Sequence, residues 1–135
     1  MRTNGAKCYL VSGGFDVITG PVAALCGFHE HRANHMHVRD NKILGTIQTP
    51  ALYPNAKAVY LEHYCKQNVV DPIDAAIIGD GTNDLARLHA AGMGVAFEGK
   101  SFLLAKVAIQ LNHTDLRGLP YPQGCKERDF IAHKI

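Results

Sequence analysis

Apolar and polar positions alternate along this chain in two ways. Short, mainly apolar segments predict strands at residues 8–11, 75–78, 94–97 and 108–111, and 75–78 is a continuous apolar run of the kind that forms a buried strand. Segments in which apolar residues recur every three or four positions separate these runs, as expected for helices. Strands that alternate with helices are typical of an α/β domain with a mainly parallel sheet. We therefore predict this fold class, with residues 1–135 as a single domain.

Three segments carry the helical spacing most clearly, and a fourth has the pattern of a hairpin. The helical positions are Val17, Ile18, Pro21, Val22 and Leu25, ending at Gly27; Ala56, Val59, Tyr60, His63 and Tyr64, ending near Asn68; and Leu85, Leu88 and Ala91. The hairpin positions, on either side of the turn pair Asp40-Asn41, are Met36, Val38, Ile43 and Ile47. We expect this hairpin to be peripheral.

Composition and charge narrow the class of protein. Of the 135 residues, 47% are hydrophobic and 19% are charged, which is enough apolar material for a folded core. No apolar run approaches the roughly 18 residues of a membrane helix, so we expect no membrane partner. The 14 Lys and Arg and 12 Asp and Glu give a net charge of +2, and the scattered basic residues argue against nucleic acid binding. Four cysteines without CxxC spacing, with no apolar export segment before them, predict reduced thiols in a cytoplasmic protein.

The first candidate site is Ser12-Gly13-Gly14, which lies between a predicted strand and a predicted helix. Small residues at such a position let backbone N–H groups approach an anion, and the helix dipole attracts negative charge. Phosphate is the anion that we expect to bind here, although an ordinary tight turn contains the same residues.

The second candidate site is Gly79-Asp80-Gly81-Thr82-Asn83-Asp84, which follows a strand of buried type. Open α/β sheets bind ligands at this end of their strands. Two carboxylates beside a phosphate site suit Mg²⁺. A turn in which Asp and Asn cap the next helix is the alternative.

Five separated segments form a longer pattern: Ser12-Gly13-Gly14-Phe15; Gly27-Phe28 with Ala33-Asn34; Ala56-Lys57-Ala58; residues 79–85; and residues 90–97. In this order they resemble the latter half of the phosphoserine phosphatases of the haloacid dehalogenase-like superfamily, over about residues 8–124. The resemblance implies a Rossmann-like, three-layer α/β/α core and Mg²⁺-dependent hydrolysis of a small phosphomonoester.

The resemblance also implies roles for individual residues. Ser12 and the Gly13 amide would bind the phosphoryl group, and Asn83 would contact it. Lys57, which by itself has the character of a solvated surface lysine, would neutralise phosphate and the attacking carboxylate. Asp80 would be a catalytic Mg²⁺ ligand, and Asp84 would complete the metal site.

One part of the family pattern does not occur in these 135 residues. The family uses an aspartate nucleophile in a DxDxT motif, and no two aspartates here have DxD spacing. The cap segment that selects the substrate is likewise not found. The resemblance therefore implies an incomplete core without its central strand, weak or no Mg²⁺ binding, and a chain that is catalytically silent or nearly so. A non-catalytic relative that binds phosphate or a partner is the alternative.

The missing central strand has a structural consequence. It would leave a slot about 9.6 Å wide, bordered by unpaired backbone groups. We expect either that the flanking strands close up or that another chain docks there. The partner would be a second copy or a complementing chain.

Four histidines within nine residues support a different class of function. Imidazoles that alternate along an extended segment bind Zn²⁺ or Ni²⁺ in some proteins, which would make this a metal-binding module. Arg32 among them and the lack of a nearby cysteine favour a solvated histidine-rich loop instead. The four are His29, His31, His35 and His37.

Overall fold

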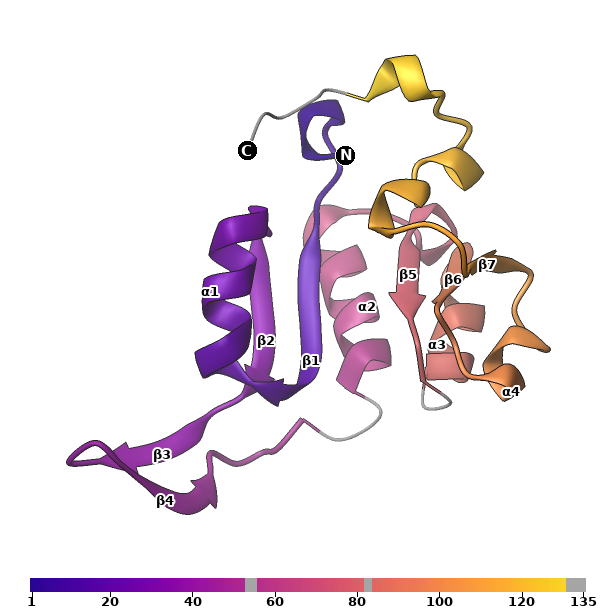
Figure 1. Cartoon of the computed structure of the whole chain (residues 1–135). Coiled ribbons are helices and arrows are strands. Elements are labelled where there is room, and N and C mark those ends of the chain that lie inside the picture. Colours follow the sequence, from indigo (N-terminus) through magenta and orange to yellow (C-terminus); the bar gives the residue numbers. More distant parts are fainter. Residues whose placement is uncertain (53–55, 82–83, 131–135) are drawn as a thin grey trace. The chain divides into compact units, whose positions relative to one another are not determined.

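The computed structural model describes residues 1–52, 56–81 and 84–130, apart from the side chain of residue 103 (Figure 1). The chain divides into two compact units, Met1–His63 and Tyr64–Ile135, and each is described by itself. The boundary falls within helix α2, Ala56–Asn68. This helix ends at Asn68, as the sequence predicts.

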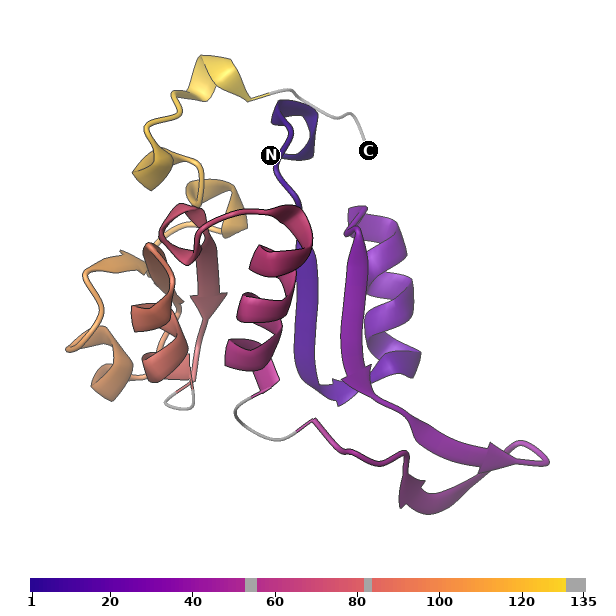
Figure 2. The same cartoon turned by 180° about the vertical axis from the view of Figure 1, so that it is seen from behind.

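Unit 1 is built on a parallel strand–helix–strand motif. Strand β1, Tyr9–Phe15, pairs in parallel with β2, Glu30–Asn34, and helix α1, Asp16–Cys26, connects them. In Figures 1 and 2, α1 lies along one side of this pair of strands. The helix ends at Gly27, as predicted, where a φ of 72° requires the left-handed conformation that glycine adopts without steric cost.

Two sequence predictions about unit 1 are wrong. The first strand does not stop at residue 11, because β1 continues through the Ser-Gly-Gly segment to Phe15. The histidine-rich segment is not a loop, because β2 occupies most of it. Its side chains find partners on both faces: His31 is hydrogen-bonded to Thr19 of α1, and the Arg32 guanidinium lies 5.8 Å from the ring centre of Tyr60. Polar partners on each side, rather than apolar residues, therefore stabilise this strand.

Helix α1 is oriented with its apolar stripe outward. Its buried residues are Thr19 and Ala23, whereas Ile18, Val22 and Leu25 are exposed, Leu25 by 88%. These three positions follow the i, i+4, i+7 spacing of a helix face that normally packs against another element.

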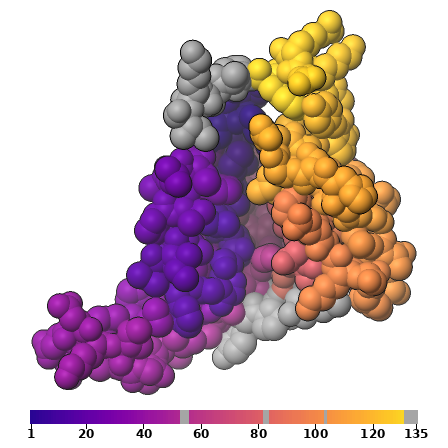
Figure 3. All heavy atoms as spheres, in the orientation of Figure 1, coloured from indigo at the N-terminus to yellow at the C-terminus, as the bar shows by residue number. Residues whose placement is uncertain are grey.

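The predicted hairpin is confirmed as β3, Met36–Arg39, and β4, Lys42–Ile47, which pair antiparallel. Asp40 and Asn41 form the two-residue turn with φ values of 51° and 59°, a conformation that Asn and Asp tolerate. Figure 3 shows the hairpin as a projection from unit 1. It is peripheral, as expected.

Unit 2 contains a three-stranded parallel sheet in the order β5-β6-β7. Its main elements are β5 (Ala76–Gly79), α3 (Leu85–Ala90), β6 (Met93–Phe97), α4 (Ser101–Leu104) and β7 (Ile109–Leu111). Short 3₁₀ turns accompany the two units: η1 (Arg2–Asn4) in unit 1, and η2 (Pro72–Asp74), η4 (Leu116–Gly118), η5 (Tyr121–Gln123) and η6 (Glu127–Asp129) in unit 2. The α/β class and the parallel pairing agree with the sequence prediction.

The core of unit 2 forms around β6, which has a strand on each side. Val95 and Ala96 of this strand are completely buried, and Leu88 of α3 forms a buried cluster with Ala96 and Val107. The edge strand β5 is only partly buried, although its apolar run predicts a fully buried strand. In α2, Tyr64 and Cys65 are buried, whereas Val59, which the pattern places on the apolar face, is exposed.

Strands β1 and β5 each have a single partner among the residues that the structure describes, β2 and β6 respectively. The closing up of the flanking strands and the docking of another chain at these edges both stay predictions. Of the helices described, none combines the length and apolar character that would let it cross a bilayer.

Truncating a large core side chain of unit 2 should destabilise the fold. Leu88 is 2% exposed, so Leu88→Ala should lower the free energy of unfolding by about 2–5 kcal/mol, through lost burial and the cavity left behind. Urea unfolding followed by circular dichroism measures this change. The control Leu116→Ala, at an exposed position, should stay within about 0.5 kcal/mol of the parent. Equal effects at both positions would contradict the placement of the core.

Candidate functional site

The Ser-Gly-Gly segment forms a bulge in β1. Val11 is opposite Arg32 and Phe15 is opposite Asn34, so residues 12–14 of β1 face only residue 33 of β2. The Ser12 hydroxyl accepts a hydrogen bond from the Gly14 N–H at 3.0 Å. Gly13 and Gly14 are exposed, and α1 begins directly after the bulge. The bulge therefore presents backbone groups just before the N-terminus of an eleven-residue helix, where an anion is favoured.

Asn34 holds this bulge in place. Its side chain is buried, its Nδ2 donates to the Gly13 carbonyl at 2.9 Å, and its Oδ1 accepts from the Leu52 N–H at 2.6 Å. One amide thus ties the bulge to the segment that precedes α2. The sequence pattern includes Ala33-Asn34 but assigns Asn34 no role.

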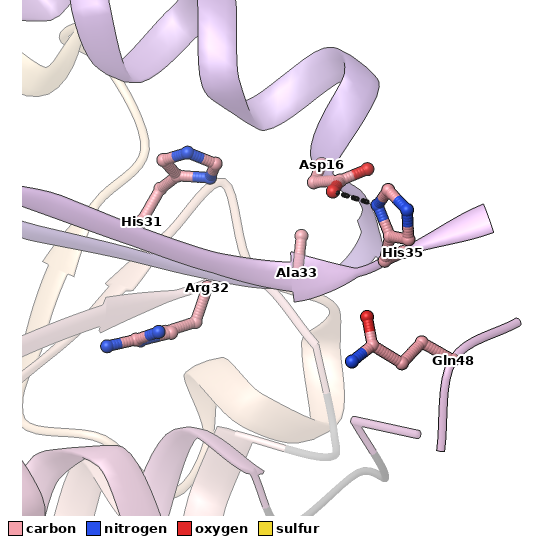
Figure 4. A pocket seen from close by; sticks show the side chains of 6 residues that line it. All are labelled: Asp16, His31, Arg32, Ala33, His35 and Gln48. Atoms are coloured by element: carbon pink, nitrogen blue, oxygen red, sulfur yellow. Dashed lines mark hydrogen bonds and ion pairs between the residues drawn. The ribbon is translucent and has the colours of Figure 1, made fainter. Parts of the chain in front are cut away.

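A hollow of about 380 Å³ lies beside the bulge (Figure 4), lined by Asp16, His31, Arg32, Ala33, His35 and Gln48. Asp16, the first residue of α1, accepts a hydrogen bond from His35 Nδ1 at 2.6 Å. This hydrogen bond, and to a lesser extent the charge of His35, lowers the pKa of Asp16 below its ordinary value of 3.8. His31 and Arg32 point to opposite sides of β2, as successive strand residues do.

The four histidines do not form a common site. Each imidazole is hydrogen-bonded to a different partner: His29 to the Cys8 backbone, His31 to Thr19, His35 to Asp16, and His37 to Thr46. Among the residues that the structure describes, no group of three or more His, Cys, Asp or Glu side chains has an arrangement that could hold a metal ion. The arrangement gives the histidine metal module no support.

The remaining predicted phosphate ligands are Lys57 and Asn83. Lys57 is the second residue of α2 and is half-buried, in the same unit as the bulge. Asn83 lies outside the described residues. Their contact with phosphate stays a prediction, as does the approach of the acidic loop to the bulge.

The acidic loop follows β5 in unit 2, and its two carboxylates differ in their surroundings. Asp80 is exposed, and its backbone carbonyl accepts from the Lys100 N–H at 3.3 Å. Asp84 is buried, and its Oδ2 accepts from the Gly81 N–H at 3.2 Å. Although Asp84 is the N-cap residue of α3, its side chain makes no capping hydrogen bond, so the helix-cap alternative is wrong for this residue.

Arg87 is the second partner of Asp84. Its Nη1 donates to Asp84 Oδ1 at 2.6 Å, and the two side chains are only 5% and 4% exposed. The carboxylate also lies against the end of β5, where a Cβ on Gly79 would come within 2.5 Å of Asp84 Oδ2. Only glycine at position 79 leaves room for it. The sequence analysis missed Arg87, although its i, i+3 spacing from Asp84 is the spacing of helical ion pairs.

These surroundings decide how well the described residues suit Mg²⁺. The exposed Asp80 can offer a carboxylate to a cation. Both oxygens of Asp84 already accept hydrogen bonds, and its neighbour Arg87 would repel a cation. The two carboxylates therefore do not fit a shared Mg²⁺ site in this arrangement.

The sequence pattern of the haloacid dehalogenase-like hydrolases matches residues 1–89, about two thirds of the chain. The chain belongs to this family. Among curated haloacid dehalogenase-like relatives, the phosphoserine phosphatase of Methanocaldococcus jannaschii is 32% identical over 117 residues, which cover 87% of this chain and 56% of that protein.

Solved structures of haloacid dehalogenase-like proteins have the same fold. The structure of a phospho-aspartyl intermediate analogue of phosphoserine phosphatase is 33% identical, with a TM-score of 0.80 over 89% of this chain and 58% of that one. A HAD-family hydrolase of Salmonella enterica serovar Typhi is 27% identical, with a TM-score of 0.83 over 89% of this chain and 42% of that one. The chain spans about half the length of the relatives it matches.

Removing the Asn34 amide should loosen the bulge. Asn34→Ala leaves the Gly13 carbonyl and the Leu52 N–H without their partly buried side-chain partner, which should lower the free energy of unfolding by about 1–3 kcal/mol. Chemical denaturation measures the loss, with Asn4→Ala on the exposed η1 turn as control. A loss no larger than that of the control would contradict the role of Asn34.

Removing the imidazole of His35 should raise the pKa of Asp16 toward 3.8, because the largest cause of its lowering is lost. Since the folded pKa lies below the ordinary value, the Asp16–His35 contribution to stability is present above that value and is lost as pH falls through the folded pKa. A ¹³C NMR titration of the carboxylates in the parent and in His35→Ala checks this. Asp115, whose pKa is lowered by Arg117 instead, is the internal control and should not move.

Proposed function

We propose that this chain supplies the phosphate-binding part of a phosphoserine phosphatase-type hydrolase that acts on a small phosphomonoester. The observation that carries this proposal is the glycine-containing bulge of β1, which lies before the N-terminus of α1 and is held by the buried amide of Asn34. Such a site favours a phosphoryl group through N–H donors and the helix dipole. The similarity to phosphoserine phosphatases supports the choice of substrate class.

The proposed roles follow from the chemistry of each side chain. Ser12 and the Gly13 N–H donate hydrogen bonds to the phosphoryl oxygens, with Asn83 as a further donor. Lys57 places a positive charge near the phosphate, which offsets the charge that develops as the phosphoryl group is transferred. Asp80 is the acidic group at the end of β5 that is available to a cation. For Ser12, binding requires its hydroxyl to turn from the Gly14 N–H to the ligand.

We also propose that these 135 residues alone do not turn over phosphoserine. None of its aspartates forms the DxD pair in which the attacking carboxylate and the acid–base carboxylate stand two residues apart. The reaction requires that carboxylate to form a bond to phosphorus while the bond to the serine oxygen breaks. Loss of a nucleophile costs on the order of 10⁶ in rate.

The missing carboxylate would come from a complementing segment, in the same polypeptide or in a partner chain. The single-sided pairing of β1 and β5 among the described residues, and the exposed apolar stripe of α1, support docking of such a segment or of a second copy. A cytoplasmic setting in serine biosynthesis would suit the relatives' substrate and the free thiols at all four cysteines.

A second candidate function is a non-catalytic phosphate-binding protein. The observation in its favour is the same absence of a DxD pair from the 135 residues, combined with a retained bulge. The two candidates differ in whether added nucleophile restores hydrolysis.

This chain should bind inorganic phosphate although it does not hydrolyse phosphoserine. Inorganic phosphate should raise the melting temperature of the parent, since a ligand bound by the folded form alone stabilises it. Ser12→Ala should reduce that rise, while Ser101→Ala, at the exposed start of α4, should not. Scanning fluorimetry measures both. No phosphate-dependent rise in the parent would contradict the proposed site.

Phosphoserine hydrolysis by the chain alone should fall about 10⁶-fold below an ordinary turnover of about 10 per second. Phosphate release, followed by a colorimetric assay, tests this. Turnover within about tenfold of the ordinary rate would contradict the proposed inactivity. Addition of a segment with a DxDxT strand should restore hydrolysis in a divided enzyme, and its failure to do so would favour the non-catalytic candidate.

A further inference from the structure

We propose that Arg87 is a built-in counter-cation of the acidic loop, residues 79–84, and that it withholds Asp84 from divalent metal ions. Arg87 would then be a positioning residue that holds the Asp84 carboxylate beside Gly79 and Gly81 without a metal. The inference rests on the proposed function only in treating this loop as part of a phosphatase site.

The first observation is that the ion pair of Arg87 and Asp84 is buried. A carboxylate that is 4% exposed needs a charged or strongly polar partner, because an isolated buried charge is very unfavourable. Arg87 supplies both a positive charge and a short, charge-assisted hydrogen bond at 2.6 Å. The electrostatic need that a metal ion would meet at Asp84 is therefore already met by a residue of the chain.

The second observation concerns the contacts of the other carboxylate oxygen of Asp84, Oδ2. Asp84 Oδ2 accepts from the Gly81 N–H, and the Asp84 N–H donates in turn to the Gly81 carbonyl at 3.0 Å. The Asp84 side chain thus links the loop at Gly81 to helix α3 at Arg87. With Gly79 lacking a Cβ, the carboxylate fits against the end of β5. This arrangement fixes Asp84 from three sides.

The third point is competition with a cation. For Asp84 to become a ligand, it would have to give up the Arg87 hydrogen bond or bring a cation beside the guanidinium charge. Mg²⁺ loses its water reluctantly and requires near-ideal octahedral geometry, so it is a poor competitor for such a carboxylate. Asp80 is exposed, and no side-chain hydrogen bond or ion pair engages it among the described residues. Cation binding by this loop should therefore depend on Asp80 and be independent of Asp84.

The experiment compares Arg87→Met with Arg87→Lys, which keeps the charge, and with Arg117→Met, which removes an arginine from the exposed pair with Asp115. Melting temperatures are measured in EDTA and in millimolar MgCl₂, without phosphate. In the parent, Arg87→Lys and Arg117→Met, MgCl₂ should raise the melting temperature only by the small amount that binding at the exposed Asp80 allows. Arg87→Met should melt lower in EDTA and recover in MgCl₂, because a cation can then take the place of the lost guanidinium beside the Asp84 carboxylate. A parent whose melting temperature rises with MgCl₂ as much as that of Arg87→Met would overturn the proposal.

A second measurement keeps the test decisive if Arg87→Met does not fold. Mn²⁺ is titrated into the parent, Asp80→Asn and Asp84→Asn by calorimetry. Asp84→Asn should leave the parent's Mn²⁺ affinity within about twofold, whereas Asp80→Asn should weaken it by about tenfold or more. A tenfold loss in Asp84→Asn would overturn the proposal, and a parent that binds no Mn²⁺ would contradict the role given to Asp80. Both measurements are independent of phosphate, so failure of the proposed phosphate site leaves them readable.

Discussion

The buried amide of Asn34 satisfies two backbone groups at once, and the geometry of the β1 bulge depends on it. Where three residues of one strand face a single residue of its neighbour, the ladder cannot pair every backbone group, and buried groups require partners. Asn34 supplies them for Gly13 and Leu52. Asp84 has the corresponding task in unit 2, where it joins Gly81 and Arg87. In both units, a polar side chain shapes the end of a parallel strand, so each candidate site has its form before any ligand arrives.

The elements with strong local signals could be predicted from the sequence. Gly27 ends α1 because a left-handed residue was needed there, and Asp40-Asn41 form the hairpin turn for a similar reason. Strand β2 could not be predicted, since its residues Glu30–Asn34 are nearly all polar and are stabilised by partners from α1 and α2. The outward direction of the apolar stripe of α1 could not be predicted either, because periodicity reveals a helix but not the direction in which its stripe points.

The candidate site could be predicted only in part. Ser12 and Gly13 stand out because small residues cluster after a strand, whereas the role of Asn34 requires knowledge that Gly13 and Leu52 lie near it. Histidine spacing left a metal module open as an alternative, but β2 ends at Asn34 and a different element begins at Met36, so the four imidazoles meet different partners. Arg87 was missed because charged helix residues are usually solvated, while its partner at i−3 is buried.

In this haloacid dehalogenase-like hydrolase chain, the β1 bulge determines where a strand can accept a change in length. Pairing of Tyr9, Leu10 and Val11 with β2 ends before the bulge, and it resumes only at Phe15. Because one slipped residue would turn every strand side chain to the opposite face, most positions in a sheet resist insertion. The bulge relieves that restriction at residues 12–14. A change in the number of residues here would therefore leave the pairing of Tyr9–Val11 with β2 in register.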